Sequence, residues 1–221
     1  MKRGLKLFSF IFLIGIFLVL SMGIVSAGLL ENVGTFFKHY FGNEDVLKAP
    51  GTSPLASYTI KLMDTRNREL PKNKEGQYQI GRGRDFFVNV YVTDLRASRE
   101  RKGIFAAYAS VITRSNLIRF TPRSLAVSST LSPRTGAIIN KNGESFIDKA
   151  GGVHKDALIT SSINSFLLLK VKARALTKGT ESIGFVPVTL LPQTHQTLLR
   201  GNNNALSEEE IAYGVVEVSI K

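Results

Sequence analysis

Apolar and polar residues alternate in short segments from about Ser57 to the C-terminus. In Phe86–Thr93, one face carries Phe86, Val88, Val90 and Val92, and the other carries Phe87, Asn89, Tyr91 and Thr93. In Ser165–Ala175, Leu167, Leu169, Val171 and Ala173 face one way, and Lys170, Lys172 and Arg174 face the other. This period of two predicts strands with one buried face, as in antiparallel sheets and sandwiches.

Further short segments have the same character and are separated by turn residues. We predict strands at Tyr58–Met63, Gln77–Ile80, Ile104–Thr113, Leu117–Thr121, Ser182–Leu191, Gln196–Arg200 and around Val216–Ile220. The intervening turns include Arg82-Gly83 and Asn140-Lys141-Asn142-Gly143. The prediction is an all-β fold, an antiparallel β-sandwich or jelly roll of about nine strands, over residues 55–221. A hydrophobic N-terminal helix is expected to precede it.

The N-terminal segment has the features of an export signal. Lys2, Arg3 and Lys6 precede an uncharged run, Leu7–Leu30, that ends near Val25-Ser26-Ala27. A basic start, an apolar stretch and small residues at the cleavage position are typical of a signal peptide over residues 1–27. The run is also long enough to span a bilayer as an uncleaved anchor. Both alternatives place the domain outside the cytoplasm: secreted, periplasmic or at the cell surface, in the last case tethered to the membrane.

Residues 28–54 are predicted to form an amphipathic helix and a linker. Apolar residues recur at helical spacing within Leu29–Phe41, whereas Gly42–Pro54 has no periodicity and contains turn residues. The helix is interpreted either as an interfacial or docking helix or as a helix that packs against its own sandwich.

Composition narrows the range of functions. The 221 residues include no cysteine and no tryptophan, and the formal net charge is +12. Disulfides and thiolate metal sites are therefore excluded, and a tryptophan platform for sugars is absent. The positive charge favours anionic partners or is simply a solvated surface. We expect no nucleic-acid partner.

No pattern of catalytic residues stands out. His39, His154 and His195 are isolated in sequence, and no Gly-x-Ser-x-Gly elbow is present. Ser207-x-x-Glu210 reads as a capping box that opens a helical turn. We expect no enzyme activity and no cofactor, and no loop of the EF-hand type supports calcium binding.

Two basic features are candidate interface elements. The loop Arg96-Ala97-Ser98-Arg99-Glu100-Arg101-Lys102 places four cations, Arg96, Arg99, Arg101 and Lys102, in one connection. Lys170, Lys172 and Arg174 lie about 7 Å apart on one face of a strand. Such cations either contact an acidic partner or an anionic polymer, or protect a sheet against edge-to-edge aggregation.

Aromatic residues supply a third candidate. Phe87 and Tyr91 share the nominally outer face of one strand, and Tyr108 would extend that face if its strand lay beside it. The patch is interpreted either as an adhesive surface or as a second core layer.

Several segments resemble one family in the right order. Gly83–Arg96 is similar to the opening strand of cohesin modules, and Gly103–Val111 resembles the next strand of the cohesin-like variant in planctomycete-type surface proteins. Phe146–Gly152, Ser165–Ala175, Leu199–Asn204 and Ile211–Val218 resemble that variant's later turn, strand and closing segments. The resemblance covers most of Tyr58–Ile220.

The resemblance implies a nine-stranded jelly roll, related to carbohydrate-binding modules, that binds other proteins. Dockerin modules are the partners of the best-known members. This chain has Thr113-Arg114-Ser115-Asn116 in place of the family's acidic turn and is more basic, so we expect another surface or secreted protein as partner. The resulting hypothesis is a non-catalytic adhesion or scaffolding module outside the cytoplasm. The alternative is a module for carbohydrate or an anionic envelope polymer, with membrane attachment through the N-terminal segment if that is uncleaved.

Overall fold

A computed structural model describes residues 53–97, 103–113, 115–154, 165–186, 197–199 and 204–221. The chain divides into two units, Met1–Asp45 and Val46–Lys221, and every described residue belongs to the second. The predicted leader and the predicted helix at Leu29–Phe41 lie outside the described residues. Within the described part, no helix is long and apolar enough to cross a membrane.

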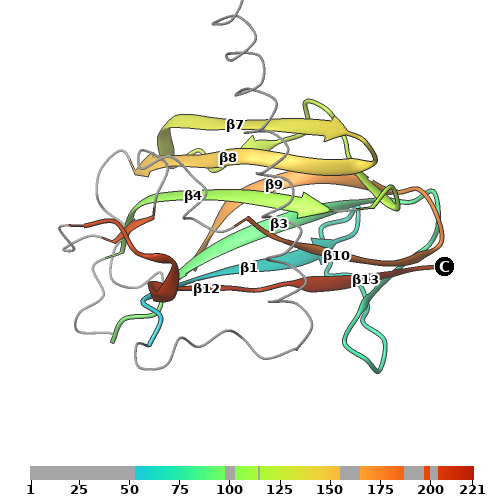
Figure 1. Ribbon diagram of the computed structural model, residues 1–221, viewed down its shortest axis with the longest axis horizontal. Coiled ribbons are helices and arrows are strands. Elements are labelled where there is room, and N and C mark those ends of the chain that lie inside the picture. Colours follow the sequence, from blue (N-terminus) through green and yellow to red (C-terminus); the bar gives the residue numbers. More distant parts are fainter. Residues whose placement is uncertain (1–52, 98–102, 114, 155–164, 187–196, 200–203) are drawn as a thin grey trace, which may run out of the picture. The chain divides into compact units, whose positions relative to one another are not determined.

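Two sheets form a sandwich (Figure 1). Sheet A has the order β12 (Ile211–Tyr213), β1 (Ala56–Met63), β3 (Asp85–Asp94), β9 (Ser165–Ala175) and β5 (Ile118–Phe120), with β6 (Ala126–Val127) also paired to β9. Sheet B has the order β2 (Tyr78–Ile80), β13 (Val216–Ile220), β10 (Gly179–Phe185), β4 (Ile104–Thr113), β8 (Glu144–His154) and β7 (Leu131–Lys141), with β11 (Leu198–Leu199) also paired to β4. The all-β sandwich predicted from the alternation is confirmed.

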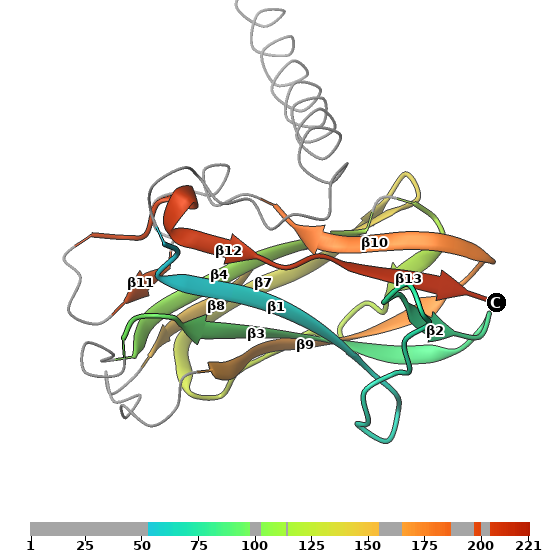
Figure 2. The same cartoon turned by 90° about the horizontal axis from the view of Figure 1, so that it is seen from below.

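Strand pairing is antiparallel except at one edge of each sheet. β12 runs parallel to β1, and β2 runs parallel to β13. Figure 2 shows β1, β3 and β9 side by side, in the antiparallel register that joins Lys61, Asn89 and Lys170 across sheet A. The nine predicted strands match nine of those described, and β6, β7, β8 and β12 are additional.

The core lies between the two sheets and is made by alternate residues of each strand. The largest fully buried side chains are Tyr58, Tyr78, Phe86, Phe120, Leu62, Ile118, Leu131, Ile147, Leu168, Leu169, Ile183 and Leu199. Each such apolar side chain contributes about 1.5–3 kcal/mol by leaving water. Without disulfides, this packing holds the sandwich together.

A β-bulge in β9 corrects one face assignment. Tyr91 pairs with Leu167, whereas Val90 pairs with Leu169, so the register shifts at Leu168. Leu168 is buried, and Leu167 shares the outer face with Tyr91. The strict alternation predicted for Ser165–Ala175 is therefore wrong at Leu167, because one extra residue in a strand moves everything beyond it to the opposite face.

The turn predicted at Asn140–Gly143 closes the β7–β8 hairpin. Asn142 and Gly143 have φ of 53° and 85°, and Lys141 pairs with Glu144. Two successive left-handed residues form the tight turn whose twist suits a hairpin, and Asn-Gly is the preferred pair for it. The predicted helical turn is also present, as a 3-10 helix at Glu208–Glu210 in which the Ser207 N–H donates to the Glu210 carboxylate.

Candidate functional site

The outer face of sheet A combines aromatic and cationic side chains. It is centred on Phe87, Asn89 and Tyr91 of β3 and is flanked by Lys61 of β1 and Lys170 of β9. The inner residues of the same strands are buried, and this burial fixes which side chains point outward. The strand pairing thus places residues that are distant in sequence on one continuous surface.

Both lysines on this face lie over aromatic rings. The Nζ of Lys170 lies 4.1 Å from the centroid of the Phe87 ring and donates a hydrogen bond of 3.2 Å to Asn67 Oδ1. The Nζ of Lys61 lies 5.8 Å from the centroid of Tyr91. A cation over an aromatic face is worth about 0.5–1 kcal/mol at an exposed site. The two contacts hold the ammonium groups close to the sheet.

Asn89 forms the floor between these residues. Its exposed fraction is 2%, and its Nδ2 lies 3.5 Å from the hydroxyl of Tyr91, to which it donates. Its Oδ1 is buried and accepts no hydrogen bond from any described residue. An unpaired buried acceptor costs about 1–3 kcal/mol. The carbonyl therefore gains most from a donor that approaches the face from outside.

The predicted basic stripe of β9 is largely paired within the fold. Lys172 Nζ lies 2.8 Å from Asp85 Oδ2, and Arg174 Nε lies 3.8 Å from Asp85 Oδ1. The hydrogen bond from Lys172 lowers the pKa of Asp85, which keeps the carboxylate charged. The stripe exists as predicted, with Asp85 between two of its three cations.

Only one of the four cations predicted in the basic loop, Arg96, lies within the described residues. Arg96 is 9% exposed in its side chain and is paired with Asp94, so it stabilises the end of β3 rather than facing solvent. Arg99, Arg101 and Lys102 lie outside the described residues.

Tyr108 does not join Phe87 and Tyr91. It lies on β4 in sheet B, whereas the other two lie on β3 in sheet A. Burial raises the pKa of Tyr108. The sequence pattern shows which residues share a strand face, but the order of strands in the two sheets follows from long-range pairing.

Asn89 was missed as a candidate residue. The sequence does hold a signal for it: Asn89 lies between Phe87 and Tyr91 on the outer face of a strand that alternates apolar and polar residues.

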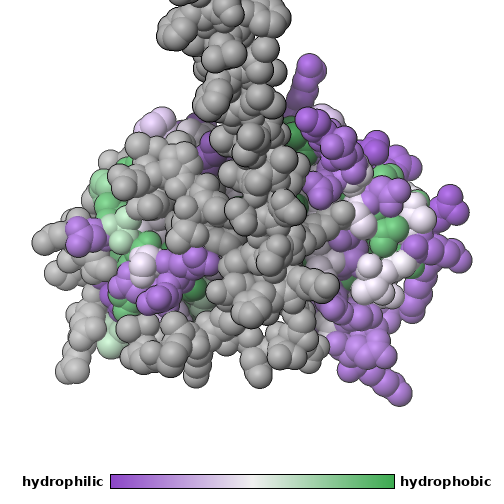
Figure 3. All heavy atoms as spheres, viewed as in Figure 1, coloured by the Kyte–Doolittle hydropathy of each residue, from purple (hydrophilic) through white to green (hydrophobic). Residues whose placement is uncertain are grey.

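Elsewhere on the described surface, hydrophilic side chains predominate in the view of Figure 3, with hydrophobic ones between them. Among the described residues, no three His, Cys, Asp or Glu side chains gather to hold a metal ion. The prediction on calcium stays a prediction.

Comparisons with known proteins give structural similarity only. No family model and no curated protein matches the chain. A type I cohesin–dockerin complex of Clostridium thermocellum has 11% identity and a TM-score of 0.44, and the match covers 75% of this chain and 99% of the other. The seventh ScaB type I cohesin of Pseudobacteroides cellulosolvens has 8% identity and a TM-score of 0.44, with coverages of 76% and 94%.

A cohesin module from a family 33 glycoside hydrolase of Clostridium perfringens has 15% identity and a TM-score of 0.34, with coverages of 76% and 98%. These proteins are of the class that the sequence motifs resemble. Because the TM-scores lie below 0.5, the similarity by itself assigns neither partner nor function, and the planctomycete-type variant stays a prediction. The chain is a two-sheet β-sandwich that resembles cohesin modules and carries an aromatic and cationic face on sheet A.

Proposed function

We propose that this protein is a non-catalytic adhesion or scaffolding module that binds another protein through the outer face of sheet A. The observation that carries the proposal is the unpaired, buried Oδ1 of Asn89 between two aromatic residues and two lysines. Aromatic residues surrounded by polar groups are typical of the energetically important centre of a protein interface. A backbone or side-chain N–H of the partner would satisfy the Asn89 carbonyl.

A protein partner suits this face better than an anionic polymer. Asp85 already pairs with two of the three cations on β9, which reduces the charge that a polymer would follow. Lys170, over Phe87, pairs with no described carboxylate, whereas Lys61, over Tyr91, lies 3.8 Å from Glu69 Oε2 in an exposed ion pair. Lys170 would therefore guide an acidic partner toward the face. Binding to carbohydrate or an anionic envelope polymer is the alternative, and it predicts retention on an acidic polysaccharide that weakens steeply with salt.

The proposed partner is a surface or secreted protein. The location outside the cytoplasm rests on the sequence of the N-terminal segment alone. Dockerin modules are the partners named in the structures of several similar cohesins, and a dockerin-like partner is one form of the proposal. Intact mass and cell fractionation test the location. A mature protein that begins at Gly28 and a membrane-bound full-length chain are both consistent with export. A full-length chain in the cytoplasmic fraction would contradict it.

The binding proposal is tested with the full-length chain in its own cells. A C-terminal tag and a cross-linker recover the partner, which mass spectrometry identifies. Lys170→Glu and Phe87→Ala are expected to abolish recovery of that same protein. Lys178→Glu is the control, because it makes the same charge reversal at an exposed lysine in the turn before β10, away from the sheet A face. Equal recovery by all four proteins, with unchanged thermal unfolding, would refute the sheet A face as the binding surface.

A further inference from the structure

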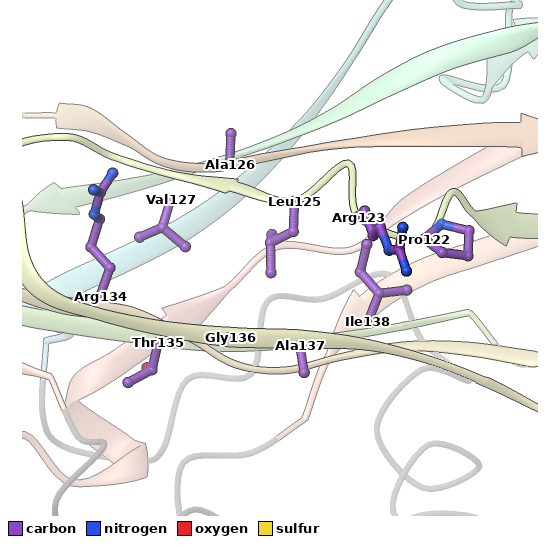
Figure 4. Close-up of a pocket in the computed structure, with 10 residues that line it drawn as sticks. All are labelled: Pro122, Arg123, Leu125, Ala126, Val127, Arg134, Thr135, Gly136, Ala137 and Ile138. Atoms are coloured by element: carbon purple, nitrogen blue, oxygen red, sulfur yellow. The ribbon is translucent and has the colours of Figure 1, made fainter.

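A groove opens where the edges of the two sheets meet. It has a volume of about 600 Å³ and lies between the segment Pro122–Val127, which leads into β6, and residues Arg134–Ile138 of β7. Figure 4 shows Leu125 and Val127 pointing from one side and Ile138 from the other, whereas Thr135 and Ala137 point away. The floor of the groove is therefore aliphatic.

One arginine stands at each end of this groove. Arg134 lies near Val127, and Arg123 lies near Ile138 (Figure 4). Both arginines are exposed, and neither forms an ion pair with a carboxylate of the described residues. No Asp or Glu is among the described residues that line the groove. The charge of the site is thus positive at both ends and apolar between them.

The backbone at Arg123 is not the one that an arginine prefers. Arg123 has φ of 62°, directly after Pro122, and the Ser124 N–H donates to the Thr121 carbonyl at 3.2 Å. A turn with proline followed by a left-handed residue favours glycine at the second position. An arginine at position 123 therefore does not stabilise the turn. Its guanidinium group instead contributes to the lining of the groove.

The β7 strand leaves one backbone edge open beside the groove. It is the last strand of sheet B and pairs with β8 alone among the described strands. Ile139 on this strand is 45% exposed, one of two large hydrophobic residues that are exposed in the described part. An open strand edge offers N–H and C=O groups to an added strand. Pro133 and Lys141 are residues that discourage edge-to-edge association, but both lie toward the ends of β7. The Arg134 side chain points into the groove (Figure 4), so the middle of the strand edge stays open to an added strand.

We propose that the groove between β6 and β7 binds an extended acidic peptide segment of another protein. The peptide would add to the free edge of β7, with one aliphatic side chain on Leu125, between the two arginines, and a carboxylate at each arginine. Arg134 and Ile138 are four residues apart, about 13 Å of strand. In an extended peptide, residues i, i+2 and i+4 share a face over the same length. The groove therefore selects the pattern acid-x-aliphatic-x-acid.

The lining argues against a sugar as the occupant. Within the described part of the chain, the residues that line the groove include no aromatic side chain that could stack on a pyranose. Two guanidinium groups at opposite ends of the groove instead suit two separate carboxylates, each of which accepts paired hydrogen bonds. This site shares no residue with the outer face of sheet A, although Ala126 of the groove pairs with Lys170 at the border between them.

The test uses the full-length chain in mild detergent and a fluorescein-labelled peptide, Glu-Ser-Val-Ser-Glu, blocked at both ends. Fluorescence polarisation is expected to show saturable binding. Arg134→Gln and Arg123→Gly should each weaken it about tenfold or more, as for the loss of a charge-assisted hydrogen bond. Arg123→Gly also relieves the left-handed backbone, so its thermal stability should be unchanged or higher. Lys74→Gln, an exposed charge in the turn before β2, is the matched control and should bind normally.

Three outcomes would overturn the inference. One is equal binding of the equally charged peptide Glu-Glu-Ser-Val-Ser, because it would show that charge alone and not spacing is recognised. Another is displacement of the peptide by a polygalacturonate tetramer with the same dependence on Arg123 and Arg134, because it would identify an anionic sugar as the occupant. The third is unchanged binding in both arginine variants. Phe87→Ala, which changes no charge, should leave peptide binding intact, and this separates failure of this site from failure of the sheet A face.

Discussion

Arg96 and Asp94 form a buried two-pronged ion pair at the end of β3. The guanidinium donates from Nε to Asp94 Oδ1 at 3.0 Å and from Nη2 to Oδ2 at 2.7 Å. The Gly103 N–H also donates to Asp94 Oδ2, at 3.3 Å, and Arg96 Nη2 donates to the Gly103 carbonyl. The pair thus joins the end of β3 to the residue before β4 and closes the connection between the two sheets.

Removing one member of this pair should strongly destabilise the fold. In Arg96→Ala the Asp94 carboxylate, 1% exposed, loses its countercharge, and we expect a loss of about 3–5 kcal/mol in the free energy of unfolding. Chemical denaturation of the full-length protein measures it. The control is Arg68→Ala, which breaks an exposed Arg68–Asp64 pair and should change the free energy of unfolding far less, because solvent screens an exposed pair. Similar losses for both variants would show that Asp94 is not buried in solution.

Replacing Asn89 with leucine should stabilise the protein and impair binding. Leucine has a similar size and removes the acceptor that has no described partner, so the free energy of unfolding should rise by about 1 kcal/mol. The same variant should lose the partner recovered through sheet A, because no carbonyl would remain to accept its N–H. A decrease in stability would mean that the Asn89 carbonyl is hydrogen-bonded in the free protein.

Gly151 should not tolerate a side chain, because β4 and β8 approach closely there. A Cβ on Gly151 would overlap the carbonyl oxygen of Ala107 and lie 2.7 Å from the Cα of Tyr108. We expect Gly151→Ala to cost about 3 kcal/mol, the upper end for overpacking. Gly143→Ala is the comparison, since its Cβ would make only an ordinary contact of 3.5 Å with the Asn116 Cβ at φ of 85° and should cost about 1 kcal/mol. Thermal unfolding of the two variants distinguishes steric overlap from backbone strain.

Stability should fall in alkaline solution through Tyr58. Burial raises the pKa of this phenol above its ordinary value of about 10, despite its hydrogen bond with Thr197. The folded state keeps the proton that the unfolded chain releases, so the free energy of unfolding is constant below about pH 10 and decreases above it.

Tyr58→Phe should reduce that alkaline slope by about 1.4 kcal/mol per pH unit. A smaller slope should remain, because the pKa of Tyr78 is also raised, by burial and by its hydrogen bond to Glu69. Urea denaturation between pH 9 and pH 12 measures both slopes. Identical profiles for the wild type and Tyr58→Phe would contradict burial of the Tyr58 hydroxyl.

The strands that could be predicted are those with an uninterrupted alternation. Ile104–Thr113 and Ser165–Ala175 were predicted with the bounds that β4 and β9 have. β7 and β8 were missed because bulges interrupt their pairing and because β7 is exposed along most of its length, which leaves little apolar periodicity to detect. β12 and β6 are too short for a period to appear.

The candidate site was predictable only in part, for a similar reason. Lys170 and Phe87 were recognised separately on their own strands, but the contact between them depends on the register of β9 against β3. Arg96 was assigned to an exposed basic loop because its charge is visible in the sequence while its burial beside Asp94 is not. The groove at Arg123 and Arg134 joins two edges from different sheets, and no local pattern connects them.

The sequence alone determined the all-β class, the hairpin turn at Asn142-Gly143 and the side of most strands that faces the core. These properties follow from local backbone preferences and from the two-residue period, which act within a few residues. The tertiary structure decided which strands are neighbours, that Tyr108 is separated from Tyr91, and that Asn89 is buried without a partner for its carbonyl. Those properties depend on hydrogen bonds and packing between segments far apart in the chain, where many pairings satisfy the same local pattern.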